Sequence, residues 1–176
     1  MTAHRHPSLW TRLRFAVPLI LIASLALPAA ASAAVSKSYA FSGIEVWATD
    51  TVGTFTGTAT GWKGDSALWR ASIEHSVQTQ PVGDITGGYA ELLTSDGTDV
   101  RGEFSGGTFT LTSASDGCAN LTHYVDGTLK DVVRSDSRKV GTGTLVGTLI
   151  HYRYWLLGTC VIYSASVSGT ITLSFR

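Results

Sequence analysis

The chain has little charge and no excess of either sign. Of its 176 residues, 13 are Lys or Arg and 13 are Asp or Glu, so the formal net charge is zero. This balance excludes the strongly basic composition expected of a nucleic-acid-binding protein. Charged residues make up 15% of the chain and hydrophobic residues 44%, which argues against intrinsic disorder. The length predicts one domain.

Motifs of specific chemistry are missing as well. The chain has no Gly-x-Ser-x-Gly nucleophile elbow, no Cys-x-x-Cys pair and no segment with convincing 3.6-residue apolar periodicity. The sequence therefore predicts no cofactor and no metal. A site made of three histidines stays open as a metal hypothesis, although their spacing is not diagnostic.

The N-terminal residues 1–33 are predicted to be a secretory signal peptide, which leaves 34–176 as one domain. Three arginines without an acid precede an apolar stretch from Phe15 to Leu27, and small residues at Ala31 and Ala33 favour cleavage after Ala33. This stretch is shorter than the roughly 20 residues of a membrane span, so an N-terminal anchor is the weaker alternative. We expect an exported protein, secreted or periplasmic, and the Ala-rich cleavage region is typical of bacteria.

Only two cysteines are present, Cys118 and Cys160. An even pair in an exported chain predicts a disulfide, whereas free thiols or half of a metal site are the alternatives. Closing a loop of this separation stabilises a fold by roughly 4 kcal/mol in the chain-entropy model.

Period-two alternation runs through every long segment after residue 34. Apolar residues and glycine alternate with Thr, Ser and charged residues, as expected of strands with one buried and one wet face. Asp-Gly pairs at 96–97, 116–117 and 126–127 predict hairpin turns, although the third lies inside a strand segment and can instead mark a bulge. The predicted strands are 39–47, 53–59, 67–77, 85–93, 99–104, 107–112, 121–129, 141–154 and 161–175.

Eight or nine strands with short links predict an all-β fold, an antiparallel meander closed into a barrel, with a β-sandwich as the alternative. An outer-membrane barrel is disfavoured because the face opposite the apolar one is rich in Ser and Thr. We therefore expect no stable membrane insertion after signal cleavage. The composition resembles that of small exported barrels such as avidin-like and lipocalin-like proteins, but none of their defining motifs is present, so the resemblance implies no function.

Ionisable side chains that fall on the apolar faces are the candidate site residues. They are Glu45, His75, Glu91, His123, His151 and Arg153. A buried charge needs a partner, and Arg153 keeps its proton at any ordinary pH. The structural alternative is that the histidines bond to backbone groups and that Arg153 reaches water along its stem. The functional hypothesis is a polar pocket with aromatic walls, contributed by Trp69, Tyr89 and Tyr163.

Three functions remain open from the sequence. The first is a barrel that binds a small ligand, anionic or carboxylate-bearing because of Arg153, without covalent catalysis. The second is a cofactor-free isomerase, cyclase or lyase with Glu45 or Glu91 as general base. The third is a structural or adhesive surface module that binds through its outer Thr/Ser face or Trp62. A hollow interior favours the first two, and a filled interior favours the third.

Overall fold

The structure, a computed structural model, describes residues 34–61, 64–77, 81–113 and 117–176. The predicted signal peptide, Trp62 and Asp116 lie outside these ranges. Eight strands follow one another as β1 (Val35–Ala48), β2 (Val52–Gly61), β3 (Ser66–His75), β4 (Val82–Thr94), β5 (Asp99–Leu111), β6 (Leu121–Arg134), β7 (Val140–Leu156) and β8 (Thr159–Phe175).

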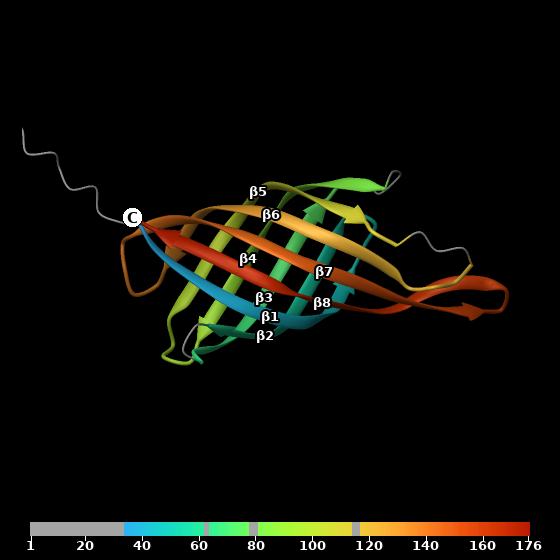
Figure 1. The fold of residues 1–176 in the computed structure, drawn as a ribbon, viewed down its shortest axis with the longest axis horizontal. Helices are drawn as coiled ribbons and strands as arrows, with labels where there is room; N and C mark the ends of the chain where they lie inside the picture. The colour runs from blue at the N-terminus through green and yellow to red at the C-terminus, as the bar shows by residue number, and fades with distance from the viewer. Residues whose placement is uncertain (1–33, 62–63, 78–80, 114–116) are drawn as a thin grey trace, which may run out of the picture. The chain divides into compact units, whose positions relative to one another are not determined.

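The strands form a closed barrel in which each pairs antiparallel with its neighbours along the chain (Figure 1). Closure comes from β1 and β8, which pair from Val35 opposite Phe175 to Ile44 opposite Ser166. The predicted all-β meander barrel is therefore confirmed and the sandwich is excluded, because a sandwich would leave β1 and β8 as unpaired edges.

Alternation of small, apolar and polar residues produces these strands, and bulges change its phase at several points. The predicted strands 99–104 and 107–112 are one strand, β5, whose pairing with β6 shifts by one residue between Phe104 and Gly106. Asp96-Gly97 lies in the β4–β5 turn, as predicted, with Gly97 at φ +84°. Asp126-Gly127 lies inside β6 and makes no turn.

The half of the barrel nearest Val35 and Phe175 is filled with side chains. Their packing buries almost all of their surface, which is the main stabilisation of a small β domain. This filled half contains Tyr39, Leu92, Leu129, Val132, Ile171, Leu173 and Phe175.

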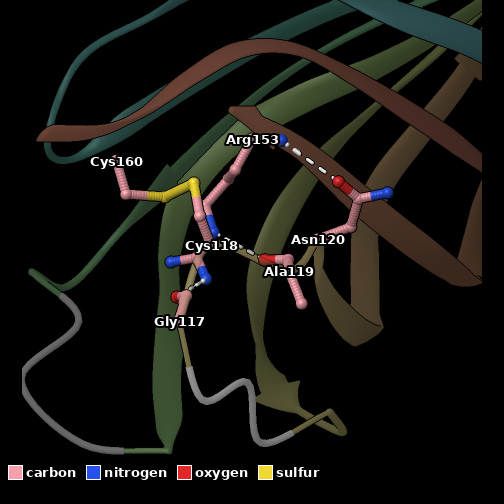
Figure 2. The surroundings of a disulfide bond; sticks show 6 residues. All are labelled: Gly117, Cys118, Ala119, Asn120, Arg153 and Cys160. Carbon is pink, nitrogen blue, oxygen red and sulfur yellow. Dashed lines mark hydrogen bonds between the residues drawn. A yellow bond between two sulfur atoms is a disulfide. The ribbon is translucent and has the colours of Figure 1, made fainter. Parts of the chain in front are cut away.

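The opposite end carries the β1–β2, β3–β4, β5–β6 and β7–β8 connections, and we call it the open end. The disulfide between Cys118 and Cys160 lies there and joins the β5–β6 connection to the start of β8 (Figure 2). The predicted disulfide is therefore present, and its location at one barrel end follows from the antiparallel order. No helix in the described ranges is long and apolar enough to cross a membrane.

Candidate functional site

A cavity of about 570 Å³ occupies the open end of the barrel. Its walls come from all eight strands, since the inward residues near each strand's open-end terminus surround it. This volume lies in the range of small-molecule sites, which are concave and mostly apolar with a few polar groups. The residues that bound its interior include Phe41, Phe55, Ile73, Ile85, Phe109, Val125, Leu145, Leu149, Ala165 and Val167.

Trp69 lies on the floor of the cavity, as expected from its inward position. Its side chain is only 2% exposed, its ring lies 4.5 Å from that of Phe41, and its indole N–H donates to the Ser42 carbonyl at 2.9 Å. A Cβ on Gly57 would stand 2.7 Å from the indole nitrogen, so glycine makes room for this ring. The indole is thus satisfied by the protein and contributes an apolar surface.

The three histidines of the β domain line the cavity from β3, β6 and β7. The rings of His123 and His151 lie 5.2 Å apart, edge to face. The ring of Phe109 lies between His75 and His123. Its centre is 4.9 Å from that of the His75 ring and 6.2 Å from that of the His123 ring. His75 Nδ1 lies 2.9 Å from the Ser76 carbonyl oxygen, so this nitrogen carries the proton and donates to it. The inward placement of all three follows the alternation in the sequence.

The charge state of this cluster is set by burial. Desolvation, helped by His151 and His75, lowers the pKa of His123 to about 4. Desolvation also lowers the pKa of His151 and raises that of Glu45. Burial disfavours the charged form of each group. At neutral pH the imidazoles of His123 and His151 are therefore uncharged.

Glu45 reaches the same cluster from β1. Its Oε2 lies 3.9 Å from His151 Nε2, which is longer than a hydrogen bond. His151 Nδ1 is buried and has no hydrogen-bond partner among the described residues. The His151 ring therefore has hydrogen-bonding capacity that a ligand hydroxyl or carbonyl can use.

The predicted inward positions of Tyr89 and Glu91 are wrong. Glu74 pairs with Gly87 and His75 with Ile85, so Thr86 is an extra residue that reverses the phase of β4. Ala90 and Leu92 are consequently buried, whereas Tyr89 and Glu91 are not.

Both displaced residues are engaged on the outer face. Glu91 forms an ion pair with Arg70, which lowers the pKa of Glu91 mainly through their hydrogen bond. The guanidinium of Arg101 lies 4.2 Å from the centre of the Tyr89 ring. Neither residue lines the cavity.

Arg153 also lies outside the cavity lining. Its Nε donates to the Ala119 carbonyl at 2.7 Å, and its Nη2 donates to the Gly117 carbonyl at 3.0 Å (Figure 2). Its backbone N–H donates to Asn120 Oδ1 at 3.1 Å. The guanidinium thus holds the segment beside the disulfide, and the expected acidic partners Glu45 and Glu91 are not bonded to it by any of these contacts.

Tyr163 lines the cavity, as predicted, and lies at its mouth. It is the extra residue of a second bulge, since Tyr152 pairs with Ser164 and Arg153 with Ile162. Its ring is largely exposed and packs near those of Tyr152 and Tyr154. Phe109 and Leu149 belong to the site although they were not singled out from the sequence; the signal was the same alternation that located the histidines.

Within the described ranges, no group of three or more His, Cys, Asp or Glu side chains is arranged to hold a metal ion. The arrangement is a half-filled, half-hollow meander barrel with a cluster of polar groups in its cavity. No family model, curated protein or solved structure matches the chain.

Proposed function

We propose that this protein binds a small, uncharged, largely apolar molecule in the cavity at the open end. The observation that carries the proposal is the cavity itself, about 570 Å³ with largely apolar walls and a few polar groups. Such a lining positions a ligand's hydrocarbon part against Phe, Ile and Val and one polar group against His151 and Glu45. A solid interior would have favoured a structural module.

The expected charge of the ligand differs from the anion inferred from the sequence. That inference depended on Arg153, whose guanidinium is bonded to loop carbonyls away from the cavity. The ionisable groups that do line the cavity are the imidazoles of His75, His123 and His151, of which the last two have lowered pKa values, and the carboxyls of Glu45 and Asp50. A carboxylate placed there would have no cation to offset its desolvation. An alcohol, ketone or similar neutral group suits the site better.

A cofactor-free proton-transfer enzyme is the second candidate. One observation favours it: Glu45 faces the cavity with a raised pKa and lies 3.9 Å from the ring of His151. Burial of this kind makes a carboxylate a stronger base. Glu91 drops out of this hypothesis because Arg70 holds it on the outer face.

The proposal includes export. The disulfide is consistent with an extracellular or periplasmic location, where such bonds persist. The predicted signal peptide at residues 1–33 supports the same compartment.

Binding is tested with the neutral fluorophore N-phenyl-1-naphthylamine and the domain from residue 34 onwards. We expect its fluorescence to rise on binding, and decanol to displace it more effectively than decanoate at pH 8. Leu149→Trp places a bulky ring in the cavity and is expected to weaken binding at least about tenfold, the equivalent of 1.4 kcal/mol.

Two variants serve as controls. Leu68→Trp puts the same ring on the exposed outer face of β3, and Arg153→Ala removes the guanidinium; both are expected to bind the fluorophore as the unmodified chain does. Equal binding by Leu149→Trp would contradict a cavity site. If decanoate displaces the fluorophore better than decanol does, and Arg153→Ala abolishes this preference, the ligand is anionic, as the sequence suggested.

A further inference from the structure

The β7–β8 hairpin extends beyond the rest of the barrel at the open end. The last pair between β6 and β7 is Leu121 with His151, and the pairing of β8 with β1 stops at Ser166. From Tyr152 to Ser164 the two strands pair only with each other. Figure 1 shows this two-stranded ribbon projecting past the other connections.

This ribbon is braced at its base and flank. A two-stranded hairpin by itself is marginally stable in water. Here the disulfide ties Cys160 to Cys118, and Arg153 donates to the carbonyls of Ala119 and Gly117 (Figure 2). The braces hold the end of the ribbon in one conformation, so its side chains are presented to the surroundings without the entropy cost of ordering a loop.

Large apolar side chains are exposed along the ribbon, from Ile162 and Tyr163 near its base to Leu157 in its turn, and we call this set the ribbon tip. Each has 44% or more of its surface exposed. Strand alternation places Tyr154 and Leu156 on one face of the ribbon and Trp155 and Ile162 on the other, so apolar side chains are exposed on both faces. Exposed apolar surface gathered on one element is uncommon on proteins and marks an interaction site. The ribbon tip consists of Tyr154, Trp155, Leu156, Leu157, Ile162 and Tyr163.

Leu157 is the most unusual of these residues. It is 99% exposed and occupies the turn with φ +49°, followed by Gly158 at φ +82°. Two-residue hairpin turns with positive φ at both positions favour Asn-Gly, because a side chain branching like that of leucine is strained there. Leu157 therefore stabilises neither the turn nor the core, and its side chain is available for contact with a partner outside the barrel.

We propose that the ribbon tip docks on the surface of a lipid bilayer. Leucines at the apex with Trp and Tyr just behind them follow the order found at membrane interfaces, where aromatic rings lie at the headgroups. Residues 137–176 contain no Asp or Glu, so the ribbon does not repel anionic headgroups.

The shape of the tip favours lipid over a protein partner. Six side chains along a narrow two-stranded ribbon fall well short of the about 20–30 residues per side of a standard protein interface. Contact through one hairpin is peripheral, so it agrees with the expectation that the domain is not inserted in a membrane.

Docking would also place the cavity mouth near the lipid. Ile162 and Tyr163 belong both to the ribbon tip and to the cavity lining, and the exposed Trp47 of β1 lines the cavity as well. This consequence rests on the proposed function: the ligand would be a molecule dissolved in the bilayer. The docking itself does not depend on the cavity being occupied.

The test is flotation of the domain with vesicles of phosphatidylcholine and of phosphatidylcholine mixed with phosphatidylglycerol. We expect the unmodified chain to float with the vesicles, more strongly when phosphatidylglycerol is present. Leu157→Asn is the informative variant, because it creates the preferred Asn-Gly turn while removing the apical apolar group. It should fold at least as stably, by urea denaturation, and bind vesicles about tenfold more weakly.

Leu68→Asn is the matched control, because Leu68 is an exposed leucine on the outer face of β3 and the substitution is the same. It should float like the unmodified chain. Leu149→Trp, which obstructs the cavity, should also float normally, so loss of ligand binding and loss of docking are separable. Absence of flotation, or equal flotation of Leu157→Asn, would overturn the proposal. If the unmodified chain instead self-associates and does not bind vesicles, and Leu157→Asn abolishes this self-association, the partner of the ribbon tip is a second copy of the chain and not lipid.

Discussion

His123 is 2% exposed, and an imidazole so placed makes the stability of the barrel depend on pH. Its pKa is lowered to about 4, against 6.5 for a free histidine. Between these values the unfolded chain binds more protons than the folded one, so stability falls as the pH is lowered through this window and levels off below it. Up to about 3 kcal/mol is lost in this way. His151 acts in the same direction, and Glu45, with its raised pKa, acts oppositely.

The variant His123→Phe tests this dependence, because it keeps a planar ring and cannot titrate. We expect its free energy of unfolding, measured with urea from pH 8 to pH 4, to fall less steeply than that of the unmodified chain. The difference should be confined to the range between about pH 6.5 and 4. Parallel curves for the two proteins would show that folding does not lower the pKa of His123.

At the level of single residues, the sequence was informative wherever a strand keeps its phase. Glu45, Trp69, His75, His123 and His151 all line the cavity, as their alternation predicted. The pKa shifts and the ring-to-ring distances could not be predicted, because they arise from strands far apart in the chain. The engagement of Arg153 with loop carbonyls was equally inaccessible, since the loop's path depends on the disulfide.

Among the elements, β4 shows why inward and outward faces cannot be assigned from alternation alone. One extra residue, Thr86, exchanges the two faces for the rest of the strand, so Tyr89 and Glu91 turn outward. Nothing in the sequence but the Gly87-Gly88 pair marks this point, and glycine pairs also occur in unbulged strands. A bulge is fixed by the neighbouring strand, whose register is a property of the assembled sheet.

Gly88, two residues after the bulge at Thr86, gives a prediction at this scale. Its φ is +103°, and a Cβ there would lie 1.9 Å from the Ser72 carbonyl oxygen. Gly88→Ala should therefore destabilise the barrel by about 2 to 3 kcal/mol, measured by urea denaturation. Gly87→Ala is the control, because its Cβ would meet only the mobile end of Glu74, and its effect should stay within about 0.5 kcal/mol. Equal losses for the two variants would show that the bulge does not depend on the conformation of Gly88.

On the scale of the whole molecule, one end of the barrel provides stability and the other end contains the candidate binding site. The end near the termini is filled and supplies the buried apolar surface, while the open end is left hollow and carries the polar groups. Closure by β1 and β8 belongs mainly to the filled half, since their pairing stops at Ile44 and Ser166. The cavity and the projecting ribbon can therefore vary in shape without loss of the fold.

The disulfide tests this division. It joins residues 42 apart in the sequence, and replacing both Cys118 and Cys160 by Ser should lower the free energy of unfolding by roughly 4 kcal/mol. The affinity for N-phenyl-1-naphthylamine should change less than about threefold, because the cavity walls are held by the barrel ladders and neither cysteine lines the cavity. Vesicle flotation should weaken, since the ribbon loses its brace while keeping every side chain of the tip. A variant that loses the fluorophore and the vesicles together would show instead that the disulfide organises the whole open end.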